Sequence, residues 1–352
     1  MRRINKKMIH SAFAQFTSFE ELQPAAGYFG DVDWEGDDFV VNGWMQAPFN
    51  LEFDTFVLYL NRRLVALTAP QMAAIESDEL TQKRDQRLFS FQLAKTKEVP
   101  NFSRIEVVGF AGDRPLRRLT TLFRGDLDTH VPTPPEHLMY RVTANKNGKI
   151  VKQAGLRCMS NFLDALSRYR DLGSVRSLLD WGCGCGRVTV HLMDFLSRYE
   201  GLQIQGCDID GEAIAWCNEH LPAGQFRQVD PYPPLPWPDN SFDVVVSCSV
   251  FTHLSEELQQ VWLQEIKRIL TPGGMFLASI NSDFPGEVPA PGISDETLDT
   301  MMDGIAPPGY YRGTVQSKAY TNGSWSSVFD ILDFIEYGIE GAQDLLVMRK
   351  PV

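Results

Sequence analysis

The sequence predicts an α/β fold, a seven-stranded, mostly parallel, doubly wound sheet preceded by a small all-β sandwich domain. Short apolar runs alternate with helical patterns in the second half, whereas short alternating or aromatic-rich runs fill residues 38–124. Between them lies Val131-Pro132-Thr133-Pro134-Pro135, and proline-rich segments stay extended with few ladder hydrogen bonds. We therefore expect a leader at 1–24 that could form a short helix, a β-sandwich accessory domain at 25–130 and an α/β domain at 131–352.

Composition and charge narrow the class of protein. Hydrophobic residues make up 43% and charged residues 22%, which is ordinary for a globular protein. No apolar run approaches the roughly 18 residues of a membrane helix, and no secretory signal is recognised, so we expect a soluble, cytoplasmic protein. The formal net charge of −12 argues against a nucleic-acid partner. The six cysteines form neither a disulfide framework nor a C-x-x-C pair, so no metal site is expected.

The β domain is predicted from runs separated by short polar turns. These runs are residues 39–41, 53–60, 63–68, 88–93, 104–110 and 116–123. The order Gly43-Trp44, then residues 57–65, then Phe89-Ser90-Phe91 resembles small β-sandwich domains attached to bacterial surface-polysaccharide enzymes. That resemblance leaves a spacer or homodimerisation role as open as carbohydrate binding.

The α/β domain begins with a helix and then alternates strands and helices. Strands are expected at residues 175–180, 203–207, 225–229, 242–248, 275–280, 328–337 and 344–348, the last two as a hairpin, and helices at 154–169, from 188, at 211–221 and at 255–270. Residues 271–274 are expected to form a turn, and residues 281–313 a Pro/Gly-rich insertion. This order predicts a parallel sheet with helices on both faces.

The loop after the first strand carries the pattern D-x-G-x-G-x-G, from Asp180 through Gly182 and Gly184 to Gly186. Glycines permit φ > 0 and close approach of a ligand, and a helix N-terminus offers free N–H groups. Arg187 occupies the place of the third glycine of G-x-G-x-x-G, which disfavours a nicotinamide-linked oxidoreductase. The loop therefore predicts a seat for a different nucleoside-bearing cofactor.

This loop resembles the first motif of the Rossmann-like class I S-adenosylmethionine (AdoMet) dependent methyltransferases, and the strand order extends the resemblance over residues 135–352. The resemblance implies AdoMet as cofactor, bound by the acidic, glycine and arginine residues of the loop and by residues after the next strands. These are Asp180, Gly182, Gly184, Gly186, Arg187, Asp208, Ile209, Val229, Asp230 and Ser247.

Three of these positions keep a second interpretation. Asp208 lies where an acidic residue accepts both ribose hydroxyls, although an N-cap for the following helix is the alternative, which Asp210 fits better. Asp180 either orients the methionine part of AdoMet or caps the loop. Arg187 either reaches a carboxylate or is a solvated surface charge.

His253 and Tyr320 are the candidate catalytic residues. His253 follows strand four, where a neutral imidazole could act as a general base near pH 7, although it could instead cap the helix that Ser255 begins. Tyr320, with Tyr310, Tyr311 and Ser317, could orient a hydroxyl-rich acceptor or simply pack.

The (D/N)PP(Y/F/W) signature of amino-methylating enzymes belongs after strand four, where this chain has Ser247-Cys248-Ser249-Val250. We therefore predict methyl transfer from AdoMet to a small polar or carbohydrate acceptor, at oxygen. The alternative is a scaffold that binds AdoMet or S-adenosylhomocysteine without turnover.

Overall fold

The structure is a computed structural model that describes residues 22, 27–48, 51–72, 86–94, 99–100, 102–221, 223–282 and 302–352. It divides the chain into two compact units, Met1–Gly125 and Asp126–Val352. The division precedes the proline-rich segment, because Val131 and Pro134 are buried and line a small pocket with helices of the second unit. Of the predicted leader, only Leu22 lies within the described residues.

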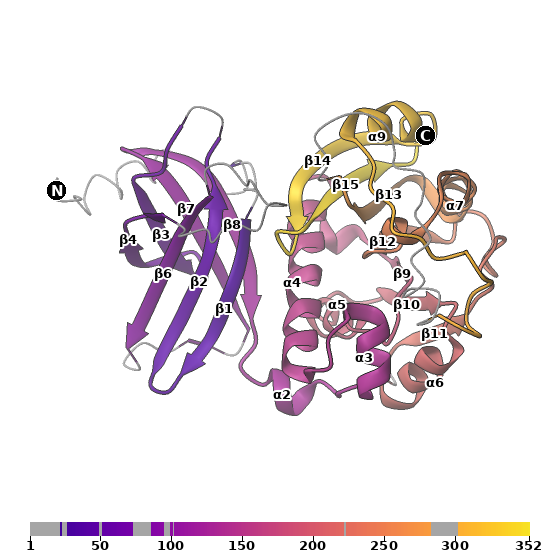
Figure 1. Ribbon diagram of the computed structural model, residues 1–352, viewed down its shortest axis with the longest axis horizontal. Coiled ribbons are helices and arrows are strands. Elements are labelled where there is room, and N and C mark those ends of the chain that lie inside the picture. The colour runs from indigo at the N-terminus through magenta and orange to yellow at the C-terminus, as the bar shows by residue number, and fades with distance from the viewer. Residues whose placement is uncertain are drawn as a thin grey trace. The chain divides into compact units, whose positions relative to one another are not determined.

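The first unit contains two four-stranded antiparallel sheets (Figure 1). Their orders are β1-β2-β6-β5 and β4-β3-β7-β8. The strands are β1 (Gly27–Glu35), β2 (Asp38–Gln46), β3 (Thr55–Leu60), β4 (Arg63–Thr68), β5 (Gln71–Met72), β6 (Gln86–Ala94), β7 (Ser103–Ala111) and β8 (Arg114–Phe123). Both sheets contribute side chains to one hydrophobic core, in which Phe56 of β3 meets Phe89 of β6 edge to face, with ring centroids 5.5 Å apart.

The second unit is built on a seven-stranded sheet of order β11-β10-β9-β12-β13-β15-β14. Its strands are β9 (Ser177–Trp181), β10 (Gln203–Asp208), β11 (Gln225–Gln228), β12 (Phe242–Ser247), β13 (Leu270–Ile280), β14 (Asp330–Ile339) and β15 (Gln343–Arg349). The first five pair in parallel, and β15 joins β13 and β14 antiparallel, which confirms the predicted sheet with its terminal hairpin. β10 and β12 lie on either side of β9, and such a reversal of strand order leaves a crevice at the carboxyl ends.

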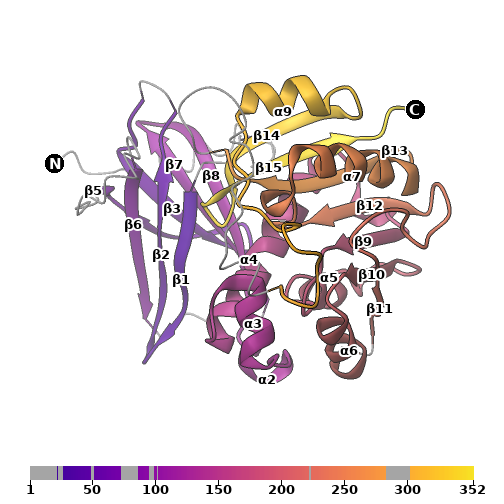
Figure 2. The same cartoon turned by 45° about the vertical axis from the view of Figure 1, so that its right-hand side comes forward.

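Helices cover both faces of this sheet, as the alternation of strands and helices predicts. They are α2 (Leu127–His130), α3 (Glu136–Thr143), α4 (Gly148–Ser167), α5 (Thr189–Leu196), α6 (Gly211–His220), α7 (Glu256–Ile269) and α9 (Lys318–Trp325), with 3-10 turns η2 (Leu172–Ser174) and η3 (Phe251–His253). Figure 2 shows α4 and α7 on opposite faces. Because both faces of the sheet are covered, the apolar residues at the centres of β9 and β12 are consecutive rather than alternating.

Some boundaries differ from the sequence-based expectation for local reasons. α4 begins at Gly148 because the Asn147 side chain accepts hydrogen bonds from the backbone N–H groups of Lys149 and Ile150. The expected turn at 271–274 is part of β13. Of the expected insertion, residues 283–301 lie outside the described residues.

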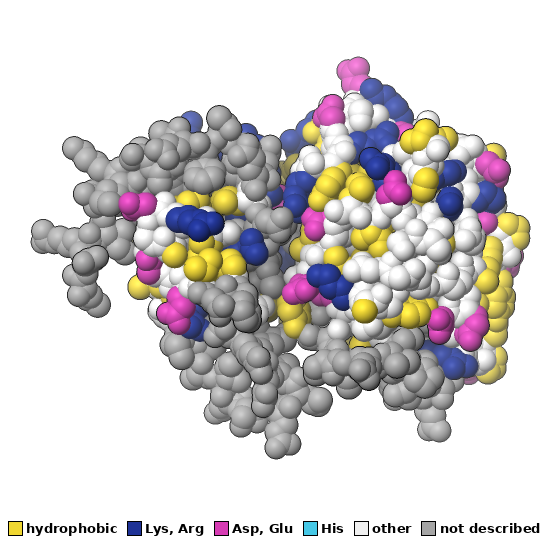
Figure 3. Space-filling view, turned by 90° about the horizontal axis from the view of Figure 1, so that it is seen from above, with side chains coloured by type: hydrophobic (Ala, Val, Ile, Leu, Met, Phe, Trp, Pro, Cys, Tyr) yellow, Lys and Arg dark blue, Asp and Glu magenta, His cyan; other side chains and the backbone are white. Residues whose placement is uncertain are grey.

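The distribution of surface charge and the character of the helices both bear on the class of protein. Basic and acidic side chains are interspersed on the face seen in Figure 3. Among the described helices, none combines the length and the apolar character that a membrane crossing requires.

Candidate functional site

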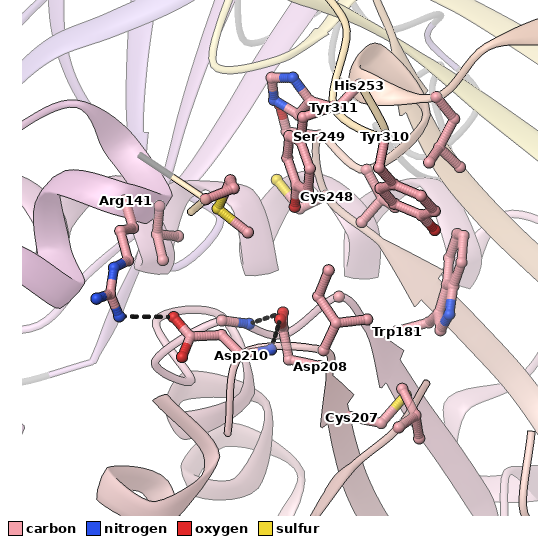
Figure 4. Close-up of a pocket in the computed structure, with 18 of the residues that line it drawn as sticks. Arg141, Trp181, Cys207, Asp208, Asp210, Cys248, Ser249, His253, Tyr310 and Tyr311 are labelled. Atoms are coloured by element: carbon pink, nitrogen blue, oxygen red, sulfur yellow. Dashed lines mark hydrogen bonds and ion pairs between the residues drawn. The ribbon is translucent and has the colours of Figure 1, made fainter. Parts of the chain in front are cut away.

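A cavity lies at the carboxyl ends of β9, β10 and β12 (Figure 4). Its walls come from α3, the glycine loop, the ends of three strands, the turn η3 and the tyrosines at 310 and 311. This is the crevice that the reversal of strand order creates, where open α/β sheets bind their ligands.

The glycine loop presents backbone, without side chains, to this cavity. Gly182 and Gly184 have φ of +77° and +53°, and both line the cavity. A Cβ at Gly182 would lie 2.2 Å from Val250, and one at Gly184 would lie 2.7 Å from Val142. Gly186, with φ of +73°, faces Leu221 instead and lies outside the cavity lining. The first two glycines are thus required both by conformation and by space.

Asp208 ends β10 and directs its carboxylate to the loop and the cavity. Its Oδ2 accepts a hydrogen bond from the backbone N–H of Gly184 at 2.7 Å, and its Oδ1 accepts one from Asp210 at 2.9 Å. Burial raises the pKa of the Asp208 carboxyl. Because an ionised carboxylate can accept about four hydrogen bonds, Asp208 retains acceptor capacity for a ribose hydroxyl.

The N-cap alternative is taken by Asp210 rather than Asp208. The Asp210 side chain accepts hydrogen bonds from the backbone N–H groups of Glu212 and Ala213, at 3.0 and 3.2 Å, at the start of α6. Its other oxygen accepts from Arg141 of α3 at 3.0 Å. Arg141 lines the cavity and was not predicted, because a helix residue without a motif carries no sequence signal of a site 69 residues away.

Asp180 and Arg187 lie behind the cavity wall rather than in it. Oδ2 of Asp180 accepts a hydrogen bond from Thr189 Oγ1 at 2.6 Å, and burial raises the pKa of this carboxyl to about 6. That contact joins the end of β9 to the start of α5, as the loop-capping interpretation predicts. The guanidinium of Arg187 instead contacts the sulfur atoms of Cys158 and Cys248.

The remaining predicted cofactor residues are divided between the cavity and its surroundings. Ile209 and Val229 line the cavity as apolar side chains. Asp230 is exposed and lies outside the lining. Ser247 is buried outside the lining, and its hydroxyl has no partner among the described residues.

His253 lines the cavity from η3, on the side facing Asp208 (Figure 4). Its Nδ1 is buried without a partner among the described residues, while the backbone of Arg312 hydrogen-bonds to the ring. Burial lowers the pKa of the His253 imidazole, so the ring is neutral at pH 7. The cap of α7 is Ser255, whose hydroxyl accepts from the backbone N–H of Leu258 at 3.4 Å.

Two tyrosines lie near His253, and the predicted third does not. Tyr311 packs its ring 5.2 Å from that of His253, and Tyr310 accepts a hydrogen bond from Trp262 at 3.3 Å. Burial raises the pKa of Tyr310 to about 12. Tyr320 lies on α9 outside the cavity lining, where its hydroxyl donates to Glu256 at 2.7 Å.

The residues present fit AdoMet. The glycine loop exposes backbone to the cavity at positions where a side chain would not fit. Asp208 has acceptor capacity for a ribose hydroxyl, and Ile209 and Val229 form an apolar wall for the adenine ring. When bound, AdoMet supplies an electrophilic methyl group on a sulfonium centre.

Comparison with known proteins supports the same family. Residues 179–278 match a family model described as a methyltransferase domain. A probable S-adenosylmethionine-dependent methyltransferase of Mycolicibacterium smegmatis is 36% identical over 30% of this chain and 37% of that protein. A probable phthiotriol/phenolphthiotriol dimycocerosates methyltransferase 2 of Mycobacterium ulcerans is 34% identical over 34% and 45%. A fatty-acid O-methyltransferase of M. smegmatis is 34% identical over 29% and 36%.

The chain thus matches less than half the length of each of these curated relatives. The predicted resemblance to the class I methyltransferases and the prediction of AdoMet as cofactor are confirmed by the family match. The matched segment contains the end of β9, the glycine loop, β10 and β12, whose carboxyl ends contribute to the wall of the cavity.

Proposed function

We propose that this chain, which carries a methyltransferase domain at residues 179–278, transfers a methyl group from AdoMet to an oxygen of a small polar acceptor. The observation that supports this most is that His253 and Asp208 face each other across one cavity (Figure 4). Asp208 would bind the ribose hydroxyls, which leaves His253 for the acceptor. The name of the fatty-acid O-methyltransferase gives oxygen as the atom methylated by that relative.

His253 is proposed as the general base. An alcohol must lose its proton as its oxygen bonds to carbon, and a positioned base contributes about 10²- to 10⁴-fold. The His253 ring is neutral at pH 7, and the backbone of Arg312 hydrogen-bonds to it. Its Nδ1, which has no partner among the described residues, can therefore accept a proton. The elements around the cavity would hold the acceptor in line and exclude water.

For the acceptor we propose a carbohydrate or another hydroxyl-rich molecule. Tyr310 and Tyr311 place aromatic rings on the wall that carries His253, and aromatic rings suit the apolar faces of ring-shaped acceptors. We further propose that the first unit is a β-sandwich accessory domain that binds carbohydrate or mediates homodimerisation. Its two sheets on a common core support the sandwich, and light scattering and glycan binding by the full chain would test the two roles.

The test is a methyl-transfer assay with the purified chain, labelled AdoMet and a panel of sugars, hydroxy acids, fatty acids, peptides and RNA. We expect S-adenosylhomocysteine to accumulate with a hydroxyl-bearing small molecule. His253→Gln should lower kcat about 10²- to 10⁴-fold and leave calorimetric AdoMet binding unchanged. His220→Gln is the matched control, because His220 stacks on Trp216 outside the cavity.

Two outcomes would overturn parts of this proposal. AdoMet binding without turnover on any acceptor would favour the scaffold alternative. Turnover on peptide or RNA alone would reject the hydroxyl acceptor while keeping the methyltransferase.

A further inference from the structure

A pair of thiols lies against the wall of the cavity, at the carboxyl end of β12. Cys248 lines the cavity, and its sulfur lies 3.7 Å from that of Cys158 on α4. Arg187 lies against both thiols, with its guanidinium nitrogens 3.4 Å from the sulfur of Cys248 and 3.6 Å from that of Cys158. When two sulfur atoms lie in contact beside a positive charge, one thiol can ionise and the other can donate a hydrogen bond to the thiolate.

Cys248 differs from the other cysteines in exposure. Cys158 and the four cysteines of the loop, β10 and α6 are buried, whereas Cys248 is half-buried and reaches the cavity. Burial raises the pKa of the thiols at Cys183, Cys185, Cys207 and Cys217. Cys207 also lines the cavity but is fully buried, so Cys248 is the more exposed of the two thiols that a small reagent meets there.

The charges around Cys248 favour its thiolate on balance. Hydrogen bonding with Cys158 and the charge of Arg187 lower the pKa of Cys248 to about 7, against burial and the more distant carboxylates of Asp180 and Glu340. Glu340 is itself held by Arg157 at 2.5 Å. Arg187, predicted as a cofactor residue, is instead placed to polarise this thiol.

We propose that Cys248 is a peroxide-reactive thiol and that hydrogen peroxide converts Cys158 and Cys248 to a disulfide at the wall of the cavity. This modification site goes beyond the proposed methyl transfer and does not depend on it. It rests on the contact between the two sulfurs, the adjoining guanidinium and the access that the cavity gives to Cys248.

The chemistry balances with peroxide as the oxidant. The Cys248 thiolate attacks one peroxide oxygen, an S–O bond forms and the O–O bond breaks, and the departing hydroxide takes a proton from solvent to give water. The sulfur of Cys158 then attacks the sulfenic sulfur, an S–S bond forms, and the hydroxyl leaves as water with the proton that Cys158 loses. Two electrons pass from the two thiols to one peroxide.

The first measurement is the rate of iodoacetamide alkylation of each cysteine in the folded chain, followed by peptide mass spectrometry. We expect Cys248 to react at least about tenfold faster than Cys217 at pH 7, with its rate rising through an apparent pKa near 7. Arg187→Gln should slow this reaction about fivefold, since a higher thiol pKa lowers the thiolate fraction more than it raises nucleophilicity. Arg187→Lys should recover part of the rate.

The second measurement is a non-reducing peptide map after treatment with hydrogen peroxide. We expect a Cys158–Cys248 cross-link that dithiothreitol reverses, and in Cys158→Ser a sulfenic acid at Cys248 that dimedone traps. Cys217→Ser should still form the cross-link. The proposal is overturned if wild-type Cys248 alkylates no faster than Cys217, or if peroxide yields no bond between these two residues. Neither readout requires methyl transfer, so the two proposals fail independently.

Discussion

The two units use glycine for opposite purposes. In the first unit, Gly43 and Gly109 lie in crowded strands. A Cβ at Gly43 would lie 2.2 Å from the backbone oxygen of Tyr28 and 2.6 Å from Phe89, and one at Gly109 would lie 2.4 Å from Phe53. In the second unit, Gly182 and Gly184 adopt positive φ and leave space beside a cavity. Glycine therefore permits close packing in the core of the first unit and a ligand-binding cavity in the second.

The two units also differ in how they stabilise a buried carboxylate. Glu106 of β7 lies 3.1 Å from Arg104 on the same strand, so a cation balances its charge. Asp180 in the second unit has a threonine hydroxyl as its hydrogen-bond partner, with Arg187 only as a more distant charge. We interpret the first as core stabilisation and the second as support for a site that must stay in one conformation.

The largest effect is expected at the cavity glycines. Gly184→Ala places a Cβ 2.7 Å from Val142 and forces a side chain into φ of +53°, so the loop must shift away from Asp208. We expect AdoMet binding, measured by calorimetry, to weaken about 100-fold, which corresponds to roughly 3 kcal/mol.

Gly201→Ala is the matched control for this variant. Gly201 has φ of +78° but no atom near its Cβ position, so it carries the backbone strain without the contact. Affinity for AdoMet should be unchanged there. Equal loss of affinity in both variants would show that backbone strain, rather than the cavity, accounts for the effect.

The next effect concerns the core of the first unit. Gly109→Ala brings a Cβ to 2.4 Å from the Phe53 ring, and such overpacking costs about 1–3 kcal/mol. We expect a lower free energy of unfolding with unchanged AdoMet affinity. Gly30→Ala is the control, since the nearest atom there is 3.8 Å away. A change in AdoMet affinity in Gly109→Ala would contradict the assignment of this glycine to packing alone.

The sequence predicted the elements whose signal is local. The apolar runs of β9 and β12 indicated strands because both of their faces are covered, and Asp208 followed from its distance to the glycine loop. The first strand, β1, was missed because most of its residues are only partly buried and acids interrupt the apolar pattern. Its pairing with β2 compensates for that weak pattern.

The parts that could not be predicted depend on contacts between distant segments. Arg187 looked like a helix-start residue that reaches either a carboxylate or water, but Cys158 of α4 and Cys248 after β12 lie against it. Arg141 reaches the cavity only because α3 packs near the start of α6. No pattern within a few residues of either arginine records these neighbours.

The smallest expected effect is a difference between Asp180 and Glu106 in how the free energy of unfolding depends on pH. Burial raises the pKa of Asp180 to about 6 from an ordinary value near 3.9, so the native state binds this proton more tightly than the unfolded state. Its stabilising contribution is complete below about pH 4 and is lost as pH rises through about 6. Asp180→Asn keeps an oxygen for Thr189 and removes the charge, so calorimetric unfolding of the second unit should lose this pH dependence and gain stability at pH 7. Glu106→Gln should instead lower stability at pH 7, because Arg104 then loses its carboxylate.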